Sequence, residues 1–131
     1  MYKFIICLFL GLIIGCSSSS VPEKTSLLNF DYSLALEKAK QENKKLLLIF
    51  YADWCGPCKQ FKATINGSTR IQEALKKDYL YYRINTDTEK EMSKKFKVSG
   101  IPASFILDAS GKTLKNQSGS QSEKEFLDWL K

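Results

Sequence analysis

Two cysteines, Cys55 and Cys58, are separated by two residues and follow the apolar run Leu46–Tyr51. A cysteine at the start of a helix faces free backbone N–H groups and the positive end of the helix dipole. Both effects stabilise a thiolate relative to a thiol, so we expect the pKa of Cys55 to fall below the ~8.5 of a free thiol. Gly56 lets the backbone of another chain approach closely, and Pro57 is tolerated in a first helical turn. The stretch therefore predicts a nucleophilic cysteine.

Cys58 lies three residues beyond Cys55, on the same side of the predicted first turn. Side chains at that spacing are about 5–6 Å apart, which a disulfide can bridge. Cys58 can therefore attack a mixed disulfide on Cys55 and release the product. A zinc site is disfavoured because it needs four ligands, and the chain has no histidine and no second CxxC. A static structural disulfide is disfavoured because so short a loop constrains the unfolded chain little. We expect a redox-active dithiol, with no metal and no cofactor.

The first 16 residues, MYKFIICLFLGLIIGC, have the layout of an export signal. One positive residue, Lys3, precedes the apolar stretch Phe4–Ile14. That stretch is shorter than the ~20 residues of a membrane-spanning helix, and its length is typical of a signal peptide. It ends in Ile-Ile-Gly-Cys, which resembles the lipobox of bacterial lipoproteins, whose cysteine is acylated and becomes the first residue after cleavage. An ordinary signal peptide or an uncleaved anchor is the alternative.

Cys16 is therefore the expected lipidation site. We expect a lipoprotein signal peptide at residues 1–15, a lipid-anchored flexible tether at residues 16–28 and a folded domain at residues 29–131. Such a domain is extracytoplasmic on a bacterial membrane, and periplasmic in a Gram-negative cell. Ser17 favours the outer membrane, because an aspartate there often holds lipoproteins at the inner one. Since Cys7 leaves with the signal, Cys55 and Cys58 are the remaining thiols.

The net charge of +6 comes mainly from lysines scattered along the chain. The two arginines, Arg70 and Arg83, form no cluster, and no aromatic-basic face indicates nucleic-acid binding. We therefore expect a solvated basic surface, with at most a mild attraction to anionic lipid headgroups. Nothing in the sequence indicates a dimer interface, so a monomer is expected.

Apolar spacing and turn signals predict alternating helices and strands. The first predicted helix is Phe30–Asn43, with an apolar face of Phe30, Leu34, Ala35 and Ala39, and the second follows the CxxC through Cys58, Phe61 and Ile65. A short third helix runs from the capping box Thr88-x-x-Glu91 to about Phe96. The last helix is capped by Ser122-x-x-Glu125 and turns Phe126, Leu127 and Leu130 inward. The predicted strands are Leu46–Tyr51, Tyr79–Ile84, Ala103–Leu107 and Thr113–Gln117. This order predicts an α/β fold whose central mixed sheet is flanked by helices on both faces, with parallel strands and one antiparallel strand from the final hairpin.

Two segments resemble the signatures of thioredoxins. Trp54-Cys55-Gly56-Pro57-Cys58-Lys59 is similar to the active-site motif, and Val98-Ser99-Gly100-Ile101-Pro102 resembles the Gly-Ile-Pro loop, whose proline follows a cis bond. The likeness covers about Phe30–Lys131. Tyr51–Cys55 is most similar to exported members, such as the thioredoxin-like domain of the bacterial membrane disulfide reductase. The chain is thus identified as a member of the thioredoxin-like family, of an exported lipoprotein type with a thioredoxin fold.

The resemblance implies a role for each matching residue. Cys55 would be the nucleophile and Cys58 the resolving cysteine, and the two would form the redox disulfide. Substrate would bind at a surface made of Trp54, Gly56, Pro57, Ile101 and Pro102. The backbone at Ile101 would pair with the substrate chain in a strand-like way.

One position departs from the family pattern. Ile49 stands where cytosolic thioredoxins have a buried aspartate that helps to move the proton of the second cysteine. Arg83 stands where they often have a lysine, and Asp53 should point to the surface. We therefore expect a high pKa for the Cys58 thiol and slow resolution of mixed disulfides.

Together these features predict a membrane-anchored, extracytoplasmic thiol-disulfide oxidoreductase. Gly-Pro between the cysteines resembles the reducing members of the family, whose potential is near −270 mV, about 150 mV below the strong periplasmic oxidant. A disulfide reductase is therefore expected. Its expected partners are exported protein thiols and disulfides, a membrane electron-donor protein, and the bilayer through acylated Cys16. The alternatives are a binding or assembly module without turnover, an oxidase, and an isomerase, which usually requires a dimer.

Overall fold

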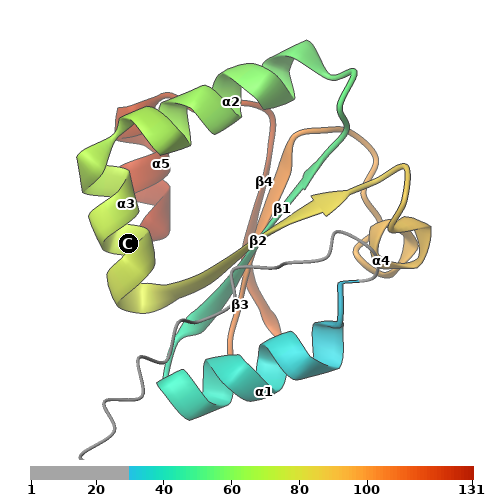
Figure 1. Cartoon of the computed structure of the whole chain (residues 1–131), viewed down its shortest axis with the longest axis vertical. Coiled ribbons are helices and arrows are strands. Elements are labelled where there is room, and N and C mark those ends of the chain that lie inside the picture. The colour runs from blue at the N-terminus through green and yellow to red at the C-terminus, as the bar shows by residue number, and fades with distance from the viewer. Residues whose placement is uncertain (1–29) are drawn as a thin grey trace, which may run out of the picture.

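The computed structural model describes residues 30–131 of the chain. The predicted signal peptide, the tether and the lipidation site at Cys16 lie outside this range. Within it, five helices and four strands follow one another, as Figure 1 shows. They are α1 (Tyr32–Glu42), β1 (Lys45–Tyr51), α2 (Gly56–Gly67), α3 (Thr69–Asp78), β2 (Tyr79–Asn85), α4 (Lys90–Lys95), β3 (Ala103–Leu107), β4 (Thr113–Ser118) and α5 (Glu123–Leu130).

The four strands form one mixed sheet in the order β2-β1-β3-β4. β1 is parallel to β2 and antiparallel to β3, and β3 is antiparallel to β4. The predicted mixed sheet is confirmed, but the parallel pairing predicted for β3 is wrong. α4 has six residues and is about 9 Å long, too short to carry the chain back along β2, which extends about 23 Å. β3 therefore begins at the end of the sheet where β2 stops.

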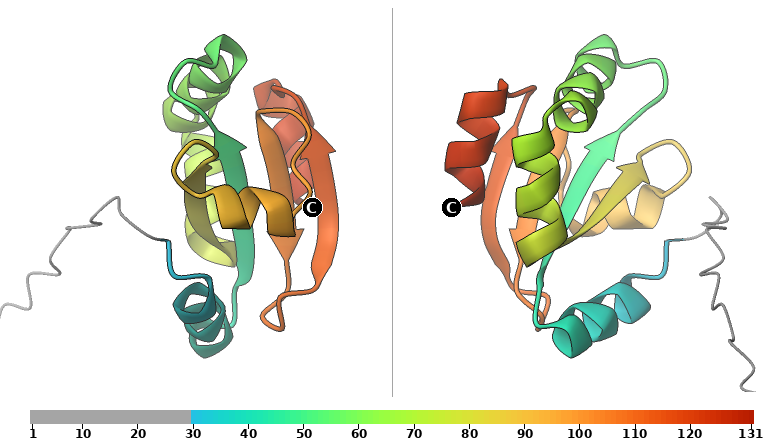
Figure 2. Two further views of the ribbon diagram at one scale, coloured as in Figure 1. Left: turned by 90° about the vertical axis from the view of Figure 1, so that its right-hand side faces the viewer. Right: turned by 60° about the vertical axis from the view of Figure 1, so that its left-hand side comes forward.

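Helices cover both faces of the sheet, as the turned views in Figure 2 also show. α2, α3 and α5 pack on the face that carries Leu47, Ile49 and Ile106. α1 and α4 contribute to the core on the other face, with Leu46 and Leu48 of β1. β1 is buried on both faces, which accounts for its continuous apolar run. The predicted architecture of a sheet between two helical layers is confirmed.

Most helix ends follow local capping signals. The side chain of Asp31 accepts a hydrogen bond from the N–H of Leu34 at 2.9 Å and caps α1. Asn43, in the left-handed conformation with φ of 52°, ends that helix. The predicted capping box of Ser122 and Glu125 is present at α5.

The capping box predicted at Thr88 and Glu91 is wrong. α4 begins after Glu89, with no side-chain cap. The Thr88 hydroxyl instead donates to the carbonyl of Asn85 at 3.4 Å, and Glu91 pairs with Lys94 at 2.8 Å. Thr88 remains in the turn after β2, so its hydroxyl caps that turn and not the helix.

The helical segment after the CxxC motif consists of two helices, where one was predicted. The helix is interrupted at Ser68, whose hydroxyl accepts a hydrogen bond from the N–H of Ile71 at 3.2 Å and caps α3. The sequence signal is a serine after Gly67, followed by Ile71 and Leu75 at helical spacing.

Two side chains assigned to the core lie farther out. Leu34 is 60% exposed, because α1 turns Ala35 and Ala39 toward the sheet. Leu127 of α5 is only partly buried, whereas Phe126 and Leu130 are buried.

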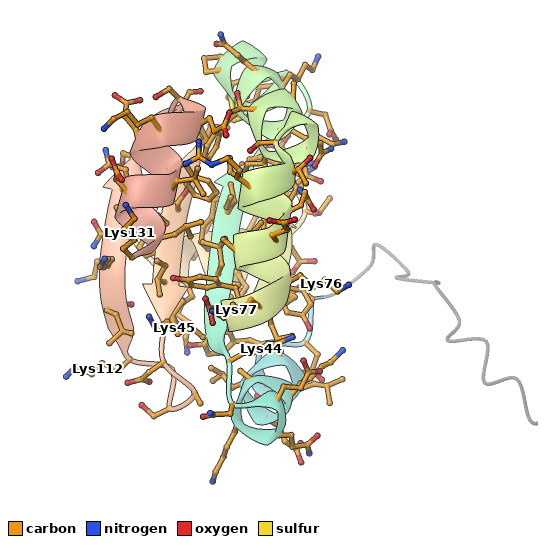
Figure 3. The ribbon with its side chains drawn as sticks, turned by 90° about the vertical axis from the view of Figure 1, so that its left-hand side faces the viewer. Lys44, Lys45, Lys76, Lys77, Lys112 and Lys131 are labelled. Carbon is orange, nitrogen blue, oxygen red and sulfur yellow. A yellow bond between two sulfur atoms is a disulfide. The ribbon has the colours of Figure 1, made fainter. Side chains whose placement is uncertain are left out.

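Lysines are spread over the surface together with carboxylates. Figure 3 shows a face that carries six of them, Lys44, Lys45, Lys76, Lys77, Lys112 and Lys131. Lys44 pairs with Glu42 at 3.1 Å and Lys131 with Asp128 at 2.7 Å. Among the helices of residues 30–131, none is long and apolar enough to cross a bilayer.

Candidate active site

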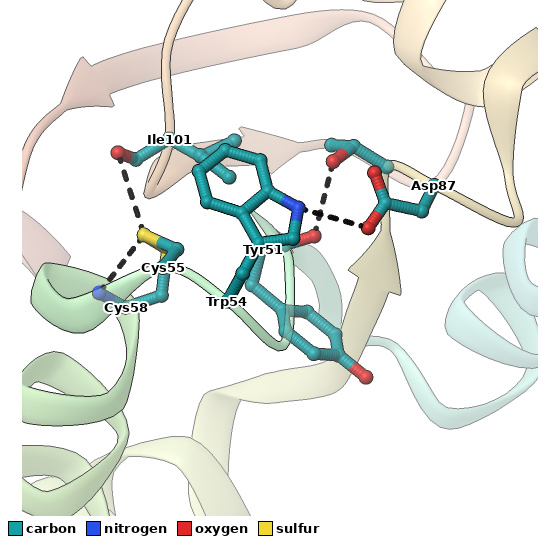
Figure 4. The surroundings of a disulfide bond; sticks show 7 residues. Tyr51, Trp54, Cys55, Cys58, Asp87 and Ile101 are labelled. Carbon is teal, nitrogen blue, oxygen red and sulfur yellow. Dashed lines mark hydrogen bonds between the residues drawn. A yellow bond between two sulfur atoms is a disulfide. The ribbon is translucent and has the colours of Figure 1, made fainter.

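Cys55 is the residue that caps the N-terminus of α2, as its position in the sequence predicts. Gly56 and Pro57 form the beginning of the helix, where the missing N–H of proline leaves no helical bond unmade. Cys55 and Cys58 form a disulfide with their Cα atoms 5.3 Å apart. The N–H of Cys58 points back at Cys55 and donates to its Sγ at 3.2 Å (Figure 4).

Opposing influences act on the charge of Cys55 once the disulfide is reduced. The N–H of Cys58 and the helix N-terminus favour a thiolate there. Burial disfavours it, since Cys55 is 4% exposed and Cys58 is 3% exposed. The carbonyl oxygen of Ile101, 3.9 Å from the Cys55 Sγ, also disfavours negative charge. The site can therefore hold a thiolate, but in a largely dry environment.

The loop before β3 brings Ile101 and Pro102 to the disulfide, although they lie far away in the sequence. The Ile101–Pro102 peptide bond is cis. Ile101 is half-buried against the cluster of Ala52 and the two cysteines, and Pro102 is buried. The Pro102 carbonyl accepts a hydrogen bond from the N–H of Gly119 at 2.8 Å, and Gly119 has a φ of 93°, which favours glycine. This bond joins the loop to the end of β4.

Trp54 lies on the surface beside the disulfide and is 71% exposed. Its indole N–H donates to the carboxylate of Asp87 at 3.0 Å (Figure 4). Asp87 follows β2, and its own N–H donates to the Asn85 side chain at 2.9 Å. Sequence reasoning missed Asp87, because only the pairing of β1 with β2 brings the two loops together.

The predicted substrate surface is thus only partly exposed. Trp54, Gly56 and Pro57 face solvent, Ile101 is half-buried and Pro102 is buried. Of the five residues predicted to contact substrate, Pro102 is therefore inaccessible, and the other four remain accessible from solvent.

No carboxylic acid is buried among the described residues. The buried polar side chains there are Ser68, Ser104 and Gln121. Ile49 is 3% exposed and packs in the apolar core. Asp53 is exposed, as predicted, and accepts a hydrogen bond from Asn85 at 3.1 Å. Residues 30–131 thus place no buried acid near Ile49 that could accept or donate a proton.

Arg83 places a positive charge at the margin of the site. Its guanidinium carbon lies 3.7 Å from the centre of the Tyr51 ring, and Tyr51 packs against the cysteine cluster. Burial raises the pKa of the neighbouring Tyr81 to about 12, although the Arg83 charge acts in the opposite direction. A stacked guanidinium keeps its charge while it covers an aromatic face.

Comparison with known proteins agrees with this geometry. Residues 32–131 match the thioredoxin-like domain, so the chain belongs to the thioredoxin-like family. A thioredoxin of Mycoplasmoides gallisepticum is 32% identical over 73% of this chain and 91% of its own length. Thioredoxin H4 of Arabidopsis thaliana is 24% identical over 86% of this chain and 83% of its own. The thiol:disulfide interchange protein DsbD of Actinobacillus pleuropneumoniae is 32% identical over 68% of this chain, but the match spans only 16% of DsbD.

Solved structures share the fold. A thioredoxin from Thermus thermophilus superposes with a TM-score of 0.68 at 21% identity, covering 77% of this chain and 82% of that one. A disulphide isomerase from Xylella fastidiosa superposes with a TM-score of 0.66 at 22% identity, covering 79% and 94%. With the family and the site established, the chain is a thioredoxin-like disulfide oxidoreductase with a redox-active CxxC.

Proposed function

We propose that this protein is a membrane-anchored, extracytoplasmic disulfide reductase that acts through the Cys55/Cys58 dithiol. The observation that carries the proposal is the position of Cys55 at the N-terminus of α2, with the N–H of Cys58 3.2 Å from its sulfur. That donor stabilises an attacking thiolate. The Gly-Pro pair between the cysteines supports the reducing direction.

The proposed reaction has two displacement steps. The Cys55 thiolate attacks one sulfur of a substrate disulfide, the substrate S–S bond breaks, and one substrate thiolate leaves. The Cys58 thiolate then attacks the Cys55 sulfur, the mixed disulfide breaks, and the second substrate thiolate leaves. Two electrons pass from the dithiol to the substrate, so a dithiol donor must reduce the protein again. We assign that task to a membrane electron-donor protein.

The proposed substrates are disulfides of exported proteins presented on extended backbone. Exposed Trp54, Gly56 and Pro57 and half-buried Ile101 provide the contact surface. DsbD, a relative over 68% of this chain, is named a thiol:disulfide interchange protein, which supports thiol–disulfide exchange as the reaction here. Lipid anchoring at Cys16 is supported by the Ile-Ile-Gly-Cys motif after Phe4–Ile14.

Reduction of insulin, with dithiothreitol as the electron donor, tests the activity. The full chain should accelerate insulin reduction, Cys55→Ser should abolish the acceleration, and Cys16→Ser should retain it as the matched control. Equal rates with the wild type and Cys55→Ser would instead indicate a binding module without turnover.

Cellular assays test the anchor and the clients. Labelled palmitate should enter the wild type and not Cys16→Ser, and label in that variant would contradict the anchor. The variant Cys58→Ala should hold clients in a mixed disulfide on Cys55, because the resolving sulfur is missing. Clients recovered from it should be exported proteins, and a set made up of cytosolic proteins would count against the proposed location.

A further inference from the structure

Ser104 of β3 buries a hydroxyl that has no hydrogen-bond partner. The residue is 0% exposed, and its Oγ is one of two buried side-chain polar atoms without a partner among residues 30–131; the other is Oε1 of Gln121. The buried Ser68 differs, since its hydroxyl caps α3. A buried hydroxyl without a partner is costly, so its presence in the core calls for an explanation.

The hydroxyl lies on the sheet face that α2 covers. The antiparallel register pairs Ser104 with Ile49 of β1, and paired residues point to the same face of a sheet. On that face Ile49 belongs to the same cluster as Phe61 of α2, and Cys58 is one turn before Phe61 on the buried side of the helix. Ser104 is also two residues after Pro102. The hydroxyl thus points toward the helical layer that contains α2, from the strand that begins directly after the Ile101–Pro102 loop.

The second step of the proposed reaction requires a thiolate at the buried sulfur of Cys58. Cys58 is 3% exposed, and burial opposes its ionisation. The ionisable groups around the site are distributed elsewhere. Tyr51 of β1 and Arg83 of β2 stack on each other, while Asp53, Lys59 and Asp87 are exposed. Ile49 has no polar atom to offer, and Ser104 is its paired neighbour on β3.

We propose that Ser104 is a positioning residue for the resolving cysteine, and that its hydroxyl donates a hydrogen bond to the Cys58 sulfur when that sulfur becomes a thiolate. In the disulfide form, the Cys58 sulfur is neutral and a weak acceptor, which accounts for the unpartnered hydroxyl. A thiolate is a strong acceptor. The inference deepens the proposed reductase function and rests on it.

The step balances without a proton on Ser104. The Cys58 thiol gives its proton to water, and its sulfur electron pair forms the bond to the Cys55 sulfur. The bond between Cys55 and the substrate breaks, and the substrate leaves as a thiolate. Ser104 keeps its own proton throughout and only stabilises the charge on Cys58.

The two steps can be timed separately by mixing the reduced full chain with Ellman's reagent. The first thionitrobenzoate released reports attack by Cys55, and the second reports resolution by Cys58. In Ser104→Ala we expect the second phase to slow about tenfold at neutral pH and its midpoint to move up by about one pH unit. The first phase should not change.

Three further variants separate the hydroxyl from the shape of the side chain. Thr and Val are nearly isosteric, so Ser104→Thr should keep the wild-type second phase and Ser104→Val should lose it. Ser68→Ala, which removes a buried hydroxyl with a structural partner, should destabilise the fold and leave the second phase unchanged. The oxidised form of Ser104→Ala should resist urea at least as well as the wild type, because it no longer buries an unpartnered hydroxyl.

Two outcomes would overturn the role of Ser104. One is a second phase with the same rate and pH midpoint in Ser104→Ala, Ser104→Val and the wild type. The other is equal slowing in Ser104→Thr and Ser104→Val, which would assign the effect to shape. Failure of the reductase function itself looks different, because the wild type would then reduce neither Ellman's reagent nor insulin.

Discussion

Reduction of the Cys55–Cys58 disulfide should lower the free energy of unfolding by about 2 kcal/mol. The bond joins residues three apart in sequence and closes a loop of four, for which the loop-closure relation gives about 1.9 kcal/mol at 25 °C. Contacts in the reduced protein modify this figure. The helix N-terminus stabilises a Cys55 thiolate by up to about 1 kcal/mol, while the burial of both cysteines opposes the charge. The effects of the helix N-terminus and of burial on the thiolate oppose each other and partly cancel, so the loop contribution sets the expected difference in stability.

The same difference in stability between the oxidised and reduced forms bears on the proposed reducing direction. If the oxidised form is more stable by about 2 kcal/mol, the folded disulfide is harder to reduce than the same CxxC in the unfolded chain by about 40 mV. A strong oxidant shows the reverse order, because its reduced form is the more stable one.

Urea unfolding followed by circular dichroism, with and without dithiothreitol, measures the difference. For an m-value of about 1–3 kcal/mol/M, the midpoint should fall by roughly 0.7–2 M on reduction. The double variant Cys55→Ser/Cys58→Ser should show no response to dithiothreitol. A reduced form that is more stable than the oxidised form would refute both the estimate of the loop contribution and the proposed reducing direction.

Three further predictions concern the fold around the site. Phe126→Ala should lower the free energy of unfolding by about 3–5 kcal/mol, because the Phe126 ring is fully buried and meets Phe61 edge to face at 5.1 Å between centroids. Urea unfolding measures the loss, and a value below about 1 kcal/mol would contradict this packing. Ser68→Ala should lower the free energy of unfolding by about 1 kcal/mol, because the α3 cap is lost. Ser68→Asp should restore most of that stability, and equal losses in both variants would exclude capping as the cause. Burial raises the pKa of Tyr81 to about 12, so the folded protein favours the neutral phenol. The contribution of Tyr81 to the free energy of unfolding is therefore complete below the pKa of about 10 in the unfolded chain, and it is lost as the pH rises toward 12. Absorbance at 295 nm should show the late ionisation, Tyr81→Phe should remove it, and a Tyr81 that ionises near pH 10 would count against its burial.

Much of the fold could be predicted because its signals are local. The run Leu46–Tyr51 indicates a strand buried on both faces, and Ser122 with Glu125 marks the start of α5. Local signals gave a wrong prediction where a side chain can form either of two competing hydrogen bonds. Thr88 satisfies the pattern of a capping box, but its hydroxyl bonds to the turn after β2. The break at Ser68 was missed, because helical spacing continues on both sides of it.

The direction of β3 could not be deduced from its order after a helix. A helix between two strands usually indicates a parallel crossover, but α4 is too short to span the sheet. Because β3 is antiparallel to β1, Ala103 pairs with Phe50 at the end of the sheet that carries the CxxC. That pairing determines which residues surround the disulfide.

The sequence by itself identified the reactive pair, because proline in a first helical turn favours a helix start at Cys55 directly after the apolar strand. It also showed that Ile49 brings no acid to the core. Only the tertiary structure decided what surrounds the pair: Ile101 faces the Cys55 sulfur, Trp54 bonds Asp87, and Ser104 lies opposite Ile49. These contacts join residues 33 to 55 positions apart, and strand register, which sets them, depends on the packing of the whole sheet.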